Sequence, residues 1–166
     1  GFLATKISYI NEISNLCEKL GIDVNEVSIG IGLDQRIGDR FLRAGPGYGG
    51  SCFPKDTRAL LNTGKKFKTE LSIVNTVVRS NDNRHKIITS KISNIMNNKL
   101  KNKKITFLGV TFKAGTDDMR ESPSLKIIPS LIKKGCLIKY YDPTGSKKEF
   151  SKLKNINYCL NIKEAC

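Results

Sequence analysis

A glycine-rich segment that leads directly into a helix start constrains this chain more than any other feature. Residues 45–56 read Gly-Pro-Gly-Tyr-Gly-Gly-Ser-Cys-Phe-Pro-Lys-Asp, with four glycines in the first six positions. Glycine permits positive φ angles and lets the backbone come close to a ligand. Pro54 is typical of a first helical turn, and helix-forming residues follow as far as Leu61. The segment predicts a tight loop that ends at a helix N-terminus.

Cys52 lies where this loop meets the predicted helix. The positive end of the helix dipole, with Lys55 and Arg58 nearby in sequence, favours a thiolate and hence a nucleophilic sulfur. Asp56 follows four residues later on the same helical face, where it can accept a proton from a thiol or from water, or cap exposed amides. The alternative for any lone cysteine is a buried, inert side chain.

Composition limits the remaining possibilities. The chain has 166 residues and 39% hydrophobic content, enough for one large or two small domains with a core. It has no apolar run of about 18 residues and no signal-peptide pattern, so we expect a cytoplasmic protein with no membrane partner. Its five cysteines are scattered without metal-ligand spacing, which predicts reduced thiols and no metal site.

The net charge of +14 is compatible with either nucleic acid or a phosphorylated substrate. The lysines are spread along the chain, with one short cluster at Lys99, Lys101, Lys103 and Lys104. No arginine and aromatic residues alternate around them, so we expect no nucleic-acid partner. A compositional bias toward lysine, asparagine and isoleucine is a further explanation of the charge.

The first half of the chain reads as helical. Residues 2–20 carry apolar side chains every three or four positions, and Gly21 is a suitable stop. This helix begins without a cap, as if the chain were cut inside a longer helix. Asp23 and Glu26 form a capping-box pattern for a second helix to about Ile29, after which glycines break the periodicity. Residues 71–96 are again mostly helical.

The second half alternates strands and helices after a polar linker at residues 97–104. We predict strands at 105–110 and 137–141, a weak third strand at 155–159, and a helix at 123–134 capped by Ser122 or Ser124. This order predicts parallel strands that bind ligands beyond their carboxyl ends. The expected fold class is α/β: a helical central domain at residues 1–98 and a partial doubly wound parallel sheet at 99–166.

Two strings in the sequence resemble the UDP-glucose 6-dehydrogenases of the nucleotide-sugar dehydrogenase family. One is the string from Gly47 to Asp56, which resembles their active-site segment. The other is Phe112-Lys113 followed by Asp118-x-Arg120-Glu121-Ser122. The resemblance implies oxidation of the sugar C6 alcohol to a carboxylate with two NAD. It makes Cys52 the nucleophile that forms a thiohemiacetal and then a thioester, and Asp56 the group that orients or activates water.

The same resemblance implies binding residues. It gives contacts with the nucleotide sugar to Arg36, Phe41, Arg43, Gly45, Gly47, Tyr48, Gly49, Phe112 and Lys113, and contacts with NAD to Lys55 and Arg120. Arg36 would reach the substrate of a neighbouring subunit, although an exposed loop arginine is equally consistent with simple solvation. Lys6, Asn11 and Glu12 read as a polar helix face, and His85 as an ordinary surface or interface residue.

The resemblance covers the middle of a family member and the first half of its C-terminal domain, without the N-terminal dinucleotide-binding domain. We therefore expect a fragment that is inactive alone and that forms a homodimer through the helix at residues 2–20, whose apolar stripe must be buried. Residues 33–38 and 4–6 favour UDP-glucose as the substrate. The alternatives are a GDP-mannose or other nucleotide-sugar 6-dehydrogenase, or a non-catalytic module for dimerisation or nucleotide binding.

Overall fold

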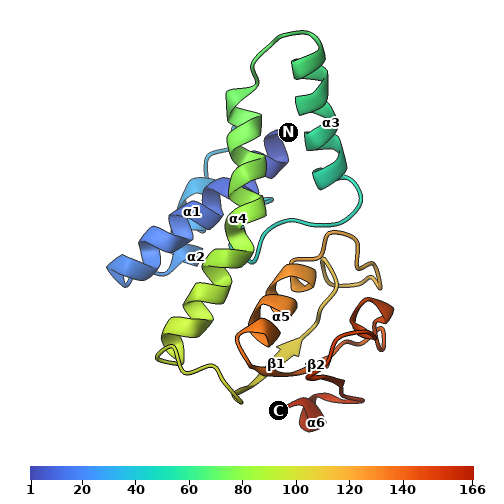
Figure 1. Ribbon diagram of the computed structural model, residues 1–166. Helices are drawn as coiled ribbons and strands as arrows, with labels where there is room; N and C mark the ends of the chain where they lie inside the picture. Colours follow the sequence, from blue (N-terminus) through green and yellow to red (C-terminus); the bar gives the residue numbers. More distant parts are fainter. The chain divides into compact units, whose positions relative to one another are not determined.

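The computed structural model describes all residues, 1–166, and they form two compact units. Unit 1 comprises Gly1–Tyr48 and Cys52–Arg84, and unit 2 comprises Gly49–Ser51 and His85–Cys166. Helix α4 (Ser72–Ile95) therefore contributes residues to both units, and so does the glycine-rich loop (Figure 1). The domain boundary expected at residues 98 and 99 stays a prediction.

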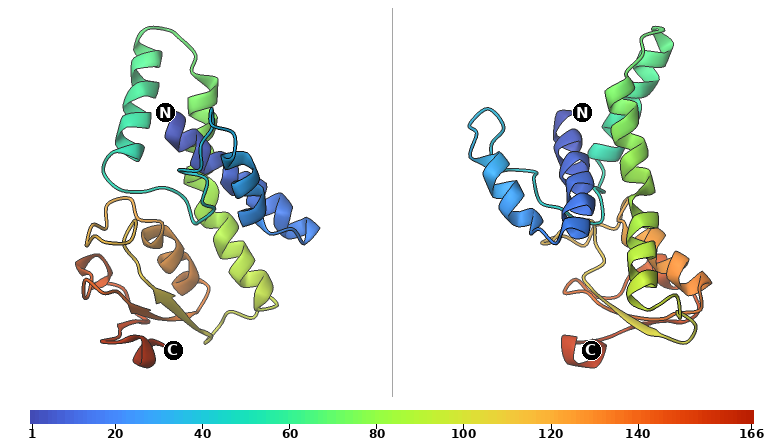
Figure 2. Two further views of the ribbon diagram at one scale, coloured as in Figure 1. Left: turned by 180° about the vertical axis from the view of Figure 1, so that it is seen from behind. Right: turned by 90° about the vertical axis from the view of Figure 1, so that its left-hand side faces the viewer.

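Unit 1 is helical, as predicted. It contains α1 (Phe2–Leu20), α2 (Val24–Gly32), α3 (Phe53–Lys66) and the first part of α4. Gly21 ends α1 in the left-handed conformation, at φ 68° and ψ 28°, which other residues adopt only with strain. The Ser8 hydroxyl reaches Val77 O at 3.5 Å, and α1 lies next to this part of α4 (Figure 2).

Helix α2 differs in two details from the prediction. It continues through Gly30 to Gly32, three residues beyond the expected end. The side chain of Asp23 caps it by accepting from the Asn25 N–H at 2.8 Å, not from Glu26. Gly32 packs closely on Asp39, since an added Cβ would lie 3.0 Å from the Asp39 Cα. Tertiary packing thus outweighs the low helix propensity of glycine at this end.

Unit 2 contains the parallel sheet. Its elements are β1 (Lys104–Leu108), α5 (Ser124–Lys133), β2 (Leu137–Tyr141), the 3₁₀ helix η1 (Lys148–Phe150), β3 (Ile156–Tyr158) and α6 (Ile162–Ala165). The strands lie in the order β1-β2-β3, and both pairs are parallel, which confirms the predicted βαβ arrangement. Residue Pro123 occupies the N-cap of α5, while the Ser122 hydroxyl accepts the Ser124 N–H at 3.3 Å and donates to Val110 O at 2.6 Å.

A single apolar core stabilises unit 2. Ile128 and Leu131 of α5 and Ile138 of β2 are at most 1% exposed and pack together with Leu100 and Phe150. Each such side chain contributes about 1.5–3 kcal/mol when it is removed from water.

No helix in the chain combines the length and the apolar character needed to span a membrane.

Candidate active site and nucleotide-sugar pocket

The first half of the glycine loop is fastened to two helices of unit 1. The Gly45 N–H donates to Asn11 Oδ1 at 2.8 Å, and Gly45 O accepts from Arg84 Nε at 2.9 Å. The Tyr48 N–H donates to Asn81 Oδ1 at 2.8 Å, and Asn81 Nδ2 donates back to Tyr48 O at 3.1 Å. Part-buried backbone groups that are satisfied in this way hold the loop in one conformation.

Arg84 is the centre of this support. Its side chain also donates to Asn11 O at 3.0 Å, Asn15 Oδ1 at 2.7 Å and Ser14 Oγ at 3.1 Å, and the residue is only 5% exposed. Burial lowers the pKa of the guanidinium, and the charge of Glu18 opposes this shift. An arginine keeps its charge under such conditions, so these hydrogen bonds are charge-assisted.

Two of the three residues that the sequence assigned to a polar helix face, Lys6 and Asn11, are in fact buried supports. Lys6 is 9% exposed and Asn11 is 4% exposed. Lys6 Nζ donates to Ile37 O at 2.8 Å and to Gly38 O at 3.1 Å, so it fixes the loop that carries Arg36. Only Glu12 remains exposed, as expected. Asn11 and Ser14 lie three residues apart among apolar positions, and this spacing is the one sequence signal that could have indicated a buried polar network.

The second half of the loop contacts the segment that follows β1, inside unit 2. The Gly50 N–H donates to Arg120 O at 2.8 Å. Gly50 has φ 82°, and a Cβ there would lie 2.8 Å from the Phe112 ring; a Cβ on Gly49 would overlap Glu121 O. Glycine is therefore required at both positions. Two predicted substrate residues, Gly49 and Phe112, are brought together here.

Cys52 is the N-cap residue of α3, and its side chain is exposed. The Asp56 N–H donates to Cys52 O at 2.8 Å, which places both residues on the first turn, as predicted, and Lys55 is exposed on the same turn. Of the other four cysteines, only Cys166 is exposed, while Cys17, Cys136 and Cys159 are buried. Burial raises the pKa of the Cys136 thiol, which makes it a poorer nucleophile.

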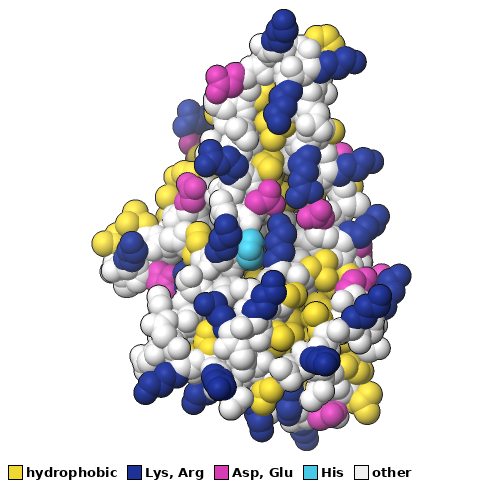
Figure 3. All heavy atoms as spheres, viewed as in Figure 1, with side chains coloured by type: hydrophobic (Ala, Val, Ile, Leu, Met, Phe, Trp, Pro, Cys, Tyr) yellow, Lys and Arg dark blue, Asp and Glu magenta, His cyan; other side chains and the backbone are white.

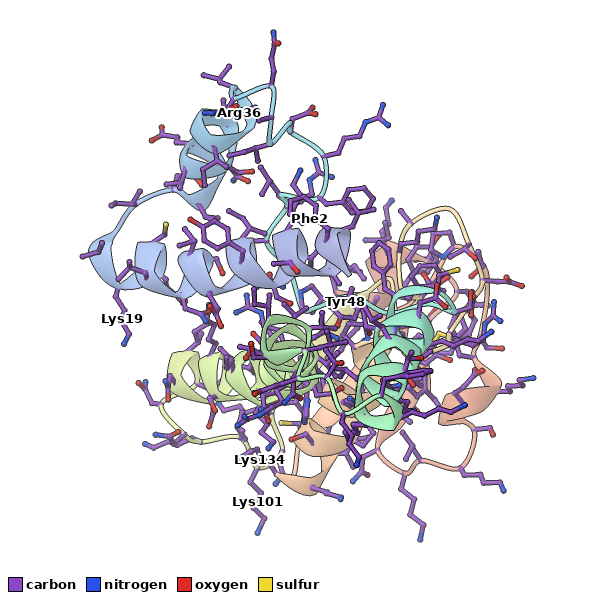
Figure 4. The ribbon with its side chains drawn as sticks, turned by 90° about the horizontal axis from the view of Figure 1, so that it is seen from above. Phe2, Lys19, Arg36, Tyr48, Lys101 and Lys134 are labelled. Carbon is purple, nitrogen blue, oxygen red and sulfur yellow. The ribbon has the colours of Figure 1, made fainter.

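Aromatic side chains support the first turn of α3. The Phe53 ring packs against Tyr48 and Phe41, with centroids 5.9 Å apart in both pairs. Tyr48 lies between α1 and α4 (Figure 4) and is 7% exposed. Burial raises the pKa of Tyr48, and a hydrogen bond with the Thr57 side chain partly offsets this shift. Phe41 has φ 65°, an unusual value for a bulky residue, and Arg43 nearby in the chain is exposed. The backbone at Phe41 is strained.

Two of the three arginines predicted to contact ligands, Arg36 and Arg120, are held in the same way, by an aspartate two residues earlier. Arg36 Nη2 lies 2.6 Å from Asp34 Oδ2, and Arg120 Nη2 lies 2.7 Å from Asp118 Oδ2. In each case the aspartate Oδ1 also accepts a hydrogen bond from the backbone N–H of the arginine at 2.9 Å. These hydrogen bonds lower the pKa of both aspartates. The arginine side chains are 89% and 69% exposed, so they are oriented yet accessible.

A pocket of about 510 Å³ opens at the carboxyl ends of β1 and β2. Its lining includes Gly109, Thr111, Lys113, Tyr141 and Thr144. Lys113 Nζ lies 5.6 Å from the centre of the Phe112 ring, where a cation and a ring attract each other. Open parallel sheets bind nucleotides at this edge. No three His, Cys, Asp or Glu side chains group in a way that could hold a metal ion.

Asp142 forms the buried floor of this pocket. Its Oδ2 accepts the Val110 N–H at 2.9 Å, and its Oδ1 accepts the N–H and hydroxyl of Thr144 at 3.0 and 2.5 Å. Lys147 Nζ lies 3.5 Å from Oδ1. Burial alone raises the pKa of this carboxyl, but the bonds from Thr144 and Val110 and the charge of Lys147 outweigh it and lower the pKa. Asp142 thus ties together the loops that follow β1 and β2.

Comparison with known sequences identifies the family. Residues 1–83 match the central domain of the UDP-glucose/GDP-mannose dehydrogenase family, and residues 106–166 match its UDP-binding domain. The chain belongs to this family. It is 47% identical to the UDP-glucose 6-dehydrogenase of Rickettsia typhi over 99% of its length, and 50% identical to that of Rhizobium meliloti over 87%. It spans 38% and 33% of these two relatives, respectively.

Solved structures of family members have the same fold. A UDP-glucose dehydrogenase from Pyrobaculum islandicum superposes with a TM-score of 0.89 and 35% identity, over 96% of this chain and 37% of that one. A GDP-mannose dehydrogenase from Pseudomonas aeruginosa gives a TM-score of 0.58 and 32% identity, over 95% of this chain and 38% of that one. The α/β fold class and the family resemblance predicted from the sequence are confirmed.

Proposed function

We propose that this chain is part of an NAD-dependent dehydrogenase that oxidises UDP-glucose at C6 to UDP-glucuronate. The observation that carries the proposal is the exposed thiol of Cys52 on the first turn of α3, directly after a loop that buried side chains hold in place. The proposal is supported by membership of the family and by 47% identity to a UDP-glucose 6-dehydrogenase.

In this mechanism Cys52 carries the sugar between the two oxidations. Once C6 is an aldehyde, Sγ bonds to that carbon as a thiohemiacetal, and the second oxidation leaves a thioester. Water then attacks the carbonyl carbon, the C–S bond breaks, and the thiolate is released with the carboxylate. Asp56 orients this water and accepts its proton. When bound, NAD supplies the hydride acceptor for both oxidations.

Binding residues complete the proposal. Lys55 and Arg120 would hold NAD, and the orientation of the exposed Arg120 guanidinium by Asp118 fits a pyrophosphate ligand. The pocket at the ends of β1 and β2 would hold UDP, with Lys113 of its lining near the phosphates and Phe112 contacting Lys113. The sugar contacts assigned to Arg36, Phe41, Arg43, Gly45, Gly47, Tyr48 and Gly49 stay predictions, as do a cytoplasmic location and inactivity of the 166 residues alone.

Activity of the protein that contains this chain tests the proposal directly. We expect two NADH and one UDP-glucuronate per UDP-glucose, and loss of acid formation in Cys52→Ala. The matched control is Cys166→Ala, the other exposed thiol, which should keep full activity. GDP-mannose is the competing substrate, because a GDP-mannose dehydrogenase shares the fold. Faster turnover of GDP-mannose, or an unchanged Cys52→Ala variant, would refute the proposal.

A homodimer through α1 is part of the same proposal, but a different row of side chains on α1 would form the interface from the one that the sequence predicted. Ile10 and Cys17 of the predicted stripe are covered by the chain itself. A second row, Phe2, Tyr9 and Leu16, repeats every seven residues and is 74%, 49% and 54% exposed. Exposed apolar rows of this kind mark protein interfaces. Sedimentation should show a dimer that Leu16→Glu disrupts and that Leu60→Glu, an exposed leucine on α3, leaves intact.

A non-catalytic role of the 166 residues in dimerisation or nucleotide binding is the second candidate. The pocket in unit 2 and the exposed row on α1 are both compatible with it. UDP binding that survives in Cys52→Ala, with no NADH formed by the wild-type protein, would favour this role over catalysis.

A further inference from the structure

All three parallel strands of unit 2 are entered through lysine-rich turns. Parallel strands begin at the same edge of a sheet, so these turns lie at the edge opposite the carboxyl ends and their pocket. The turns hold eight exposed lysines and no acidic residue. We call this set the basic edge: Lys99, Lys101, Lys103, Lys104, Lys133, Lys134, Lys152 and Lys154.

Part of the basic edge forms a concave site. A pocket of about 510 Å³ is lined by four of its lysines, Lys99, Lys101, Lys103 and Lys134, together with Ser93, Asn98 and Leu100. Its size is within the range of pockets that bind small molecules. Lys101 and Lys134 come from different turns and extend next to each other (Figure 4). In Figure 3 dark-blue side chains gather at the lower left, without an acidic side chain among them.

The backbone fixes the positions of these lysines. The Asn102 N–H donates to Gly135 O and the Leu137 N–H donates to Lys103 O, both at 2.8 Å, so the two turns are paired. A Cβ on Gly135 would lie 3.2 Å from the Lys101 Cα, which shows how closely the turns approach. Leu100, 4% exposed, anchors the first turn in the core. The backbone therefore holds the Cα positions of these lysines near one another before any ligand binds.

Eight exposed cations at one edge of a sheet attract anions. The carboxyl ends of α4 and α5 attract cations, but this effect accounts for one or two charges at each end and not for eight. The pocket contains no arginine, so it has no guanidinium to bind a phosphate through two parallel hydrogen bonds. It contains no aromatic ring on which a nucleotide base could stack. Ammonium groups bind phosphate oxygens as point charges. We propose that this pocket binds an oligophosphate, such as pyrophosphate or triphosphate, independently of the nucleotide-sugar pocket.

Titration of the chain with pyrophosphate at low ionic strength tests this site. We expect the double variant Lys101→Gln/Lys134→Gln to bind pyrophosphate at least about tenfold more weakly than the wild type. The matched control is Lys65→Gln/Lys66→Gln, which removes the same charge from the last turn of a unit 1 helix, α3, and should change affinity less than about twofold. Pyrophosphate should also raise the melting temperature of the wild type and the control more than that of the pocket variant.

A third variant separates this site from the nucleotide-sugar pocket. Lys113→Gln should weaken UDP binding and leave pyrophosphate binding unchanged, whether or not the proposed dehydrogenase activity holds. The proposal is wrong if Lys113→Gln removes pyrophosphate binding, or if the control double variant loses as much affinity as the pocket variant. It is also wrong if a short duplex DNA binds at the basic edge while pyrophosphate does not.

Discussion

The two units have nearly the same size but are stabilised differently. Unit 2 buries twelve hydrophobic residues and unit 1 buries six, while each buries six polar or charged residues. Large exposed hydrophobic residues show the opposite distribution, with thirteen in unit 1 and six in unit 2. Unit 2 therefore has a core of its own. Unit 1 buries fewer hydrophobic residues, so hydrogen bonds carry a larger share of its stability, and it leaves more apolar surface exposed.

Charge separates the units as well. Unit 2 carries 17 lysine and arginine residues against six acidic ones, a net charge of +11, whereas unit 1 has a net charge of +3. Most of the net charge of the chain, +11 of +14, thus belongs to the unit that contains the pocket at the carboxyl ends of β1 and β2 and the basic edge. The same difference is present along the sequence, because residues 49–51 carry no charge and the two units otherwise divide the chain between Arg84 and His85.

The largest expected effect is on the apolar core of unit 2. Leu131→Ala should lower the free energy of unfolding by about 4 kcal/mol, because the fully buried side chain leaves a cavity. Urea denaturation followed by circular dichroism measures the loss. Leu160→Ala, 76% exposed in the same unit, is the control and should stay within about 0.5 kcal/mol of the wild type. Equal losses in the two variants would contradict a leucine-filled core.

In unit 1 the second-largest effect is expected from the loss of a buried polar side chain, Arg84. Arg84→Met should lower the free energy of unfolding by about 3 kcal/mol, because it removes four hydrogen bonds and leaves buried acceptors in the glycine loop and α1 unsatisfied. The exposed Arg79 of α4 supplies the control, Arg79→Met. Amide exchange of Gly45 and Tyr48 should accelerate in the first variant only. If methionine stabilises this unit, apolar packing and not the polar network supports it.

Asp142 should make unit 2 sensitive to acid. Its pKa is lower in the folded chain than the unfolded value of about 3.9, so its stabilisation is present above that pH and is lost as pH falls through the folded pKa. Asp142→Asn should cost about 2 kcal/mol at pH 7. Thermal unfolding should show that the difference in the free energy of unfolding between the wild type and this variant becomes smaller below about pH 4. Asp117→Asn, at an exposed position, should show no such convergence.

The smallest expected effect is a difference between the two units in how often they open locally. Buried cysteines can report it, because Cys17 lies in unit 1 and Cys136 in unit 2. At near-neutral pH, Cys52 and Cys166 should react at once with a thiol reagent, with Cys52 the faster if its place at the start of α3 activates it. Cys17 of unit 1 should react about tenfold faster than Cys136 of unit 2, a difference of about 1.4 kcal/mol in opening. Peptide mapping after timed alkylation measures both orders, and a faster Cys136 would reverse the ranking of the units.

The sequence by itself determined the elements that depend on neighbouring residues. The end of α1 at Gly21, the start of α3 within one residue of Pro54 and the bounds of β2 follow from turn chemistry, proline geometry and alternating side chains. The loop with Cys52 and the family resemblance were also evident there. Each of these features is specified within about ten residues, the range over which backbone conformation responds to local sequence.

Tertiary structure decided what holds the loop and which surfaces remain open. Arg84 and Asn81 lie 39 and 33 residues from the loop residues whose backbone they bind, and nothing in their local sequence indicates that contact. Local sequence also does not indicate that Asp142 accepts a hydrogen bond from the Val110 N–H, or that Phe2, Tyr9 and Leu16 of α1 stay exposed. A hydrogen bond or a buried face has two partners, and only folding decides which partners meet.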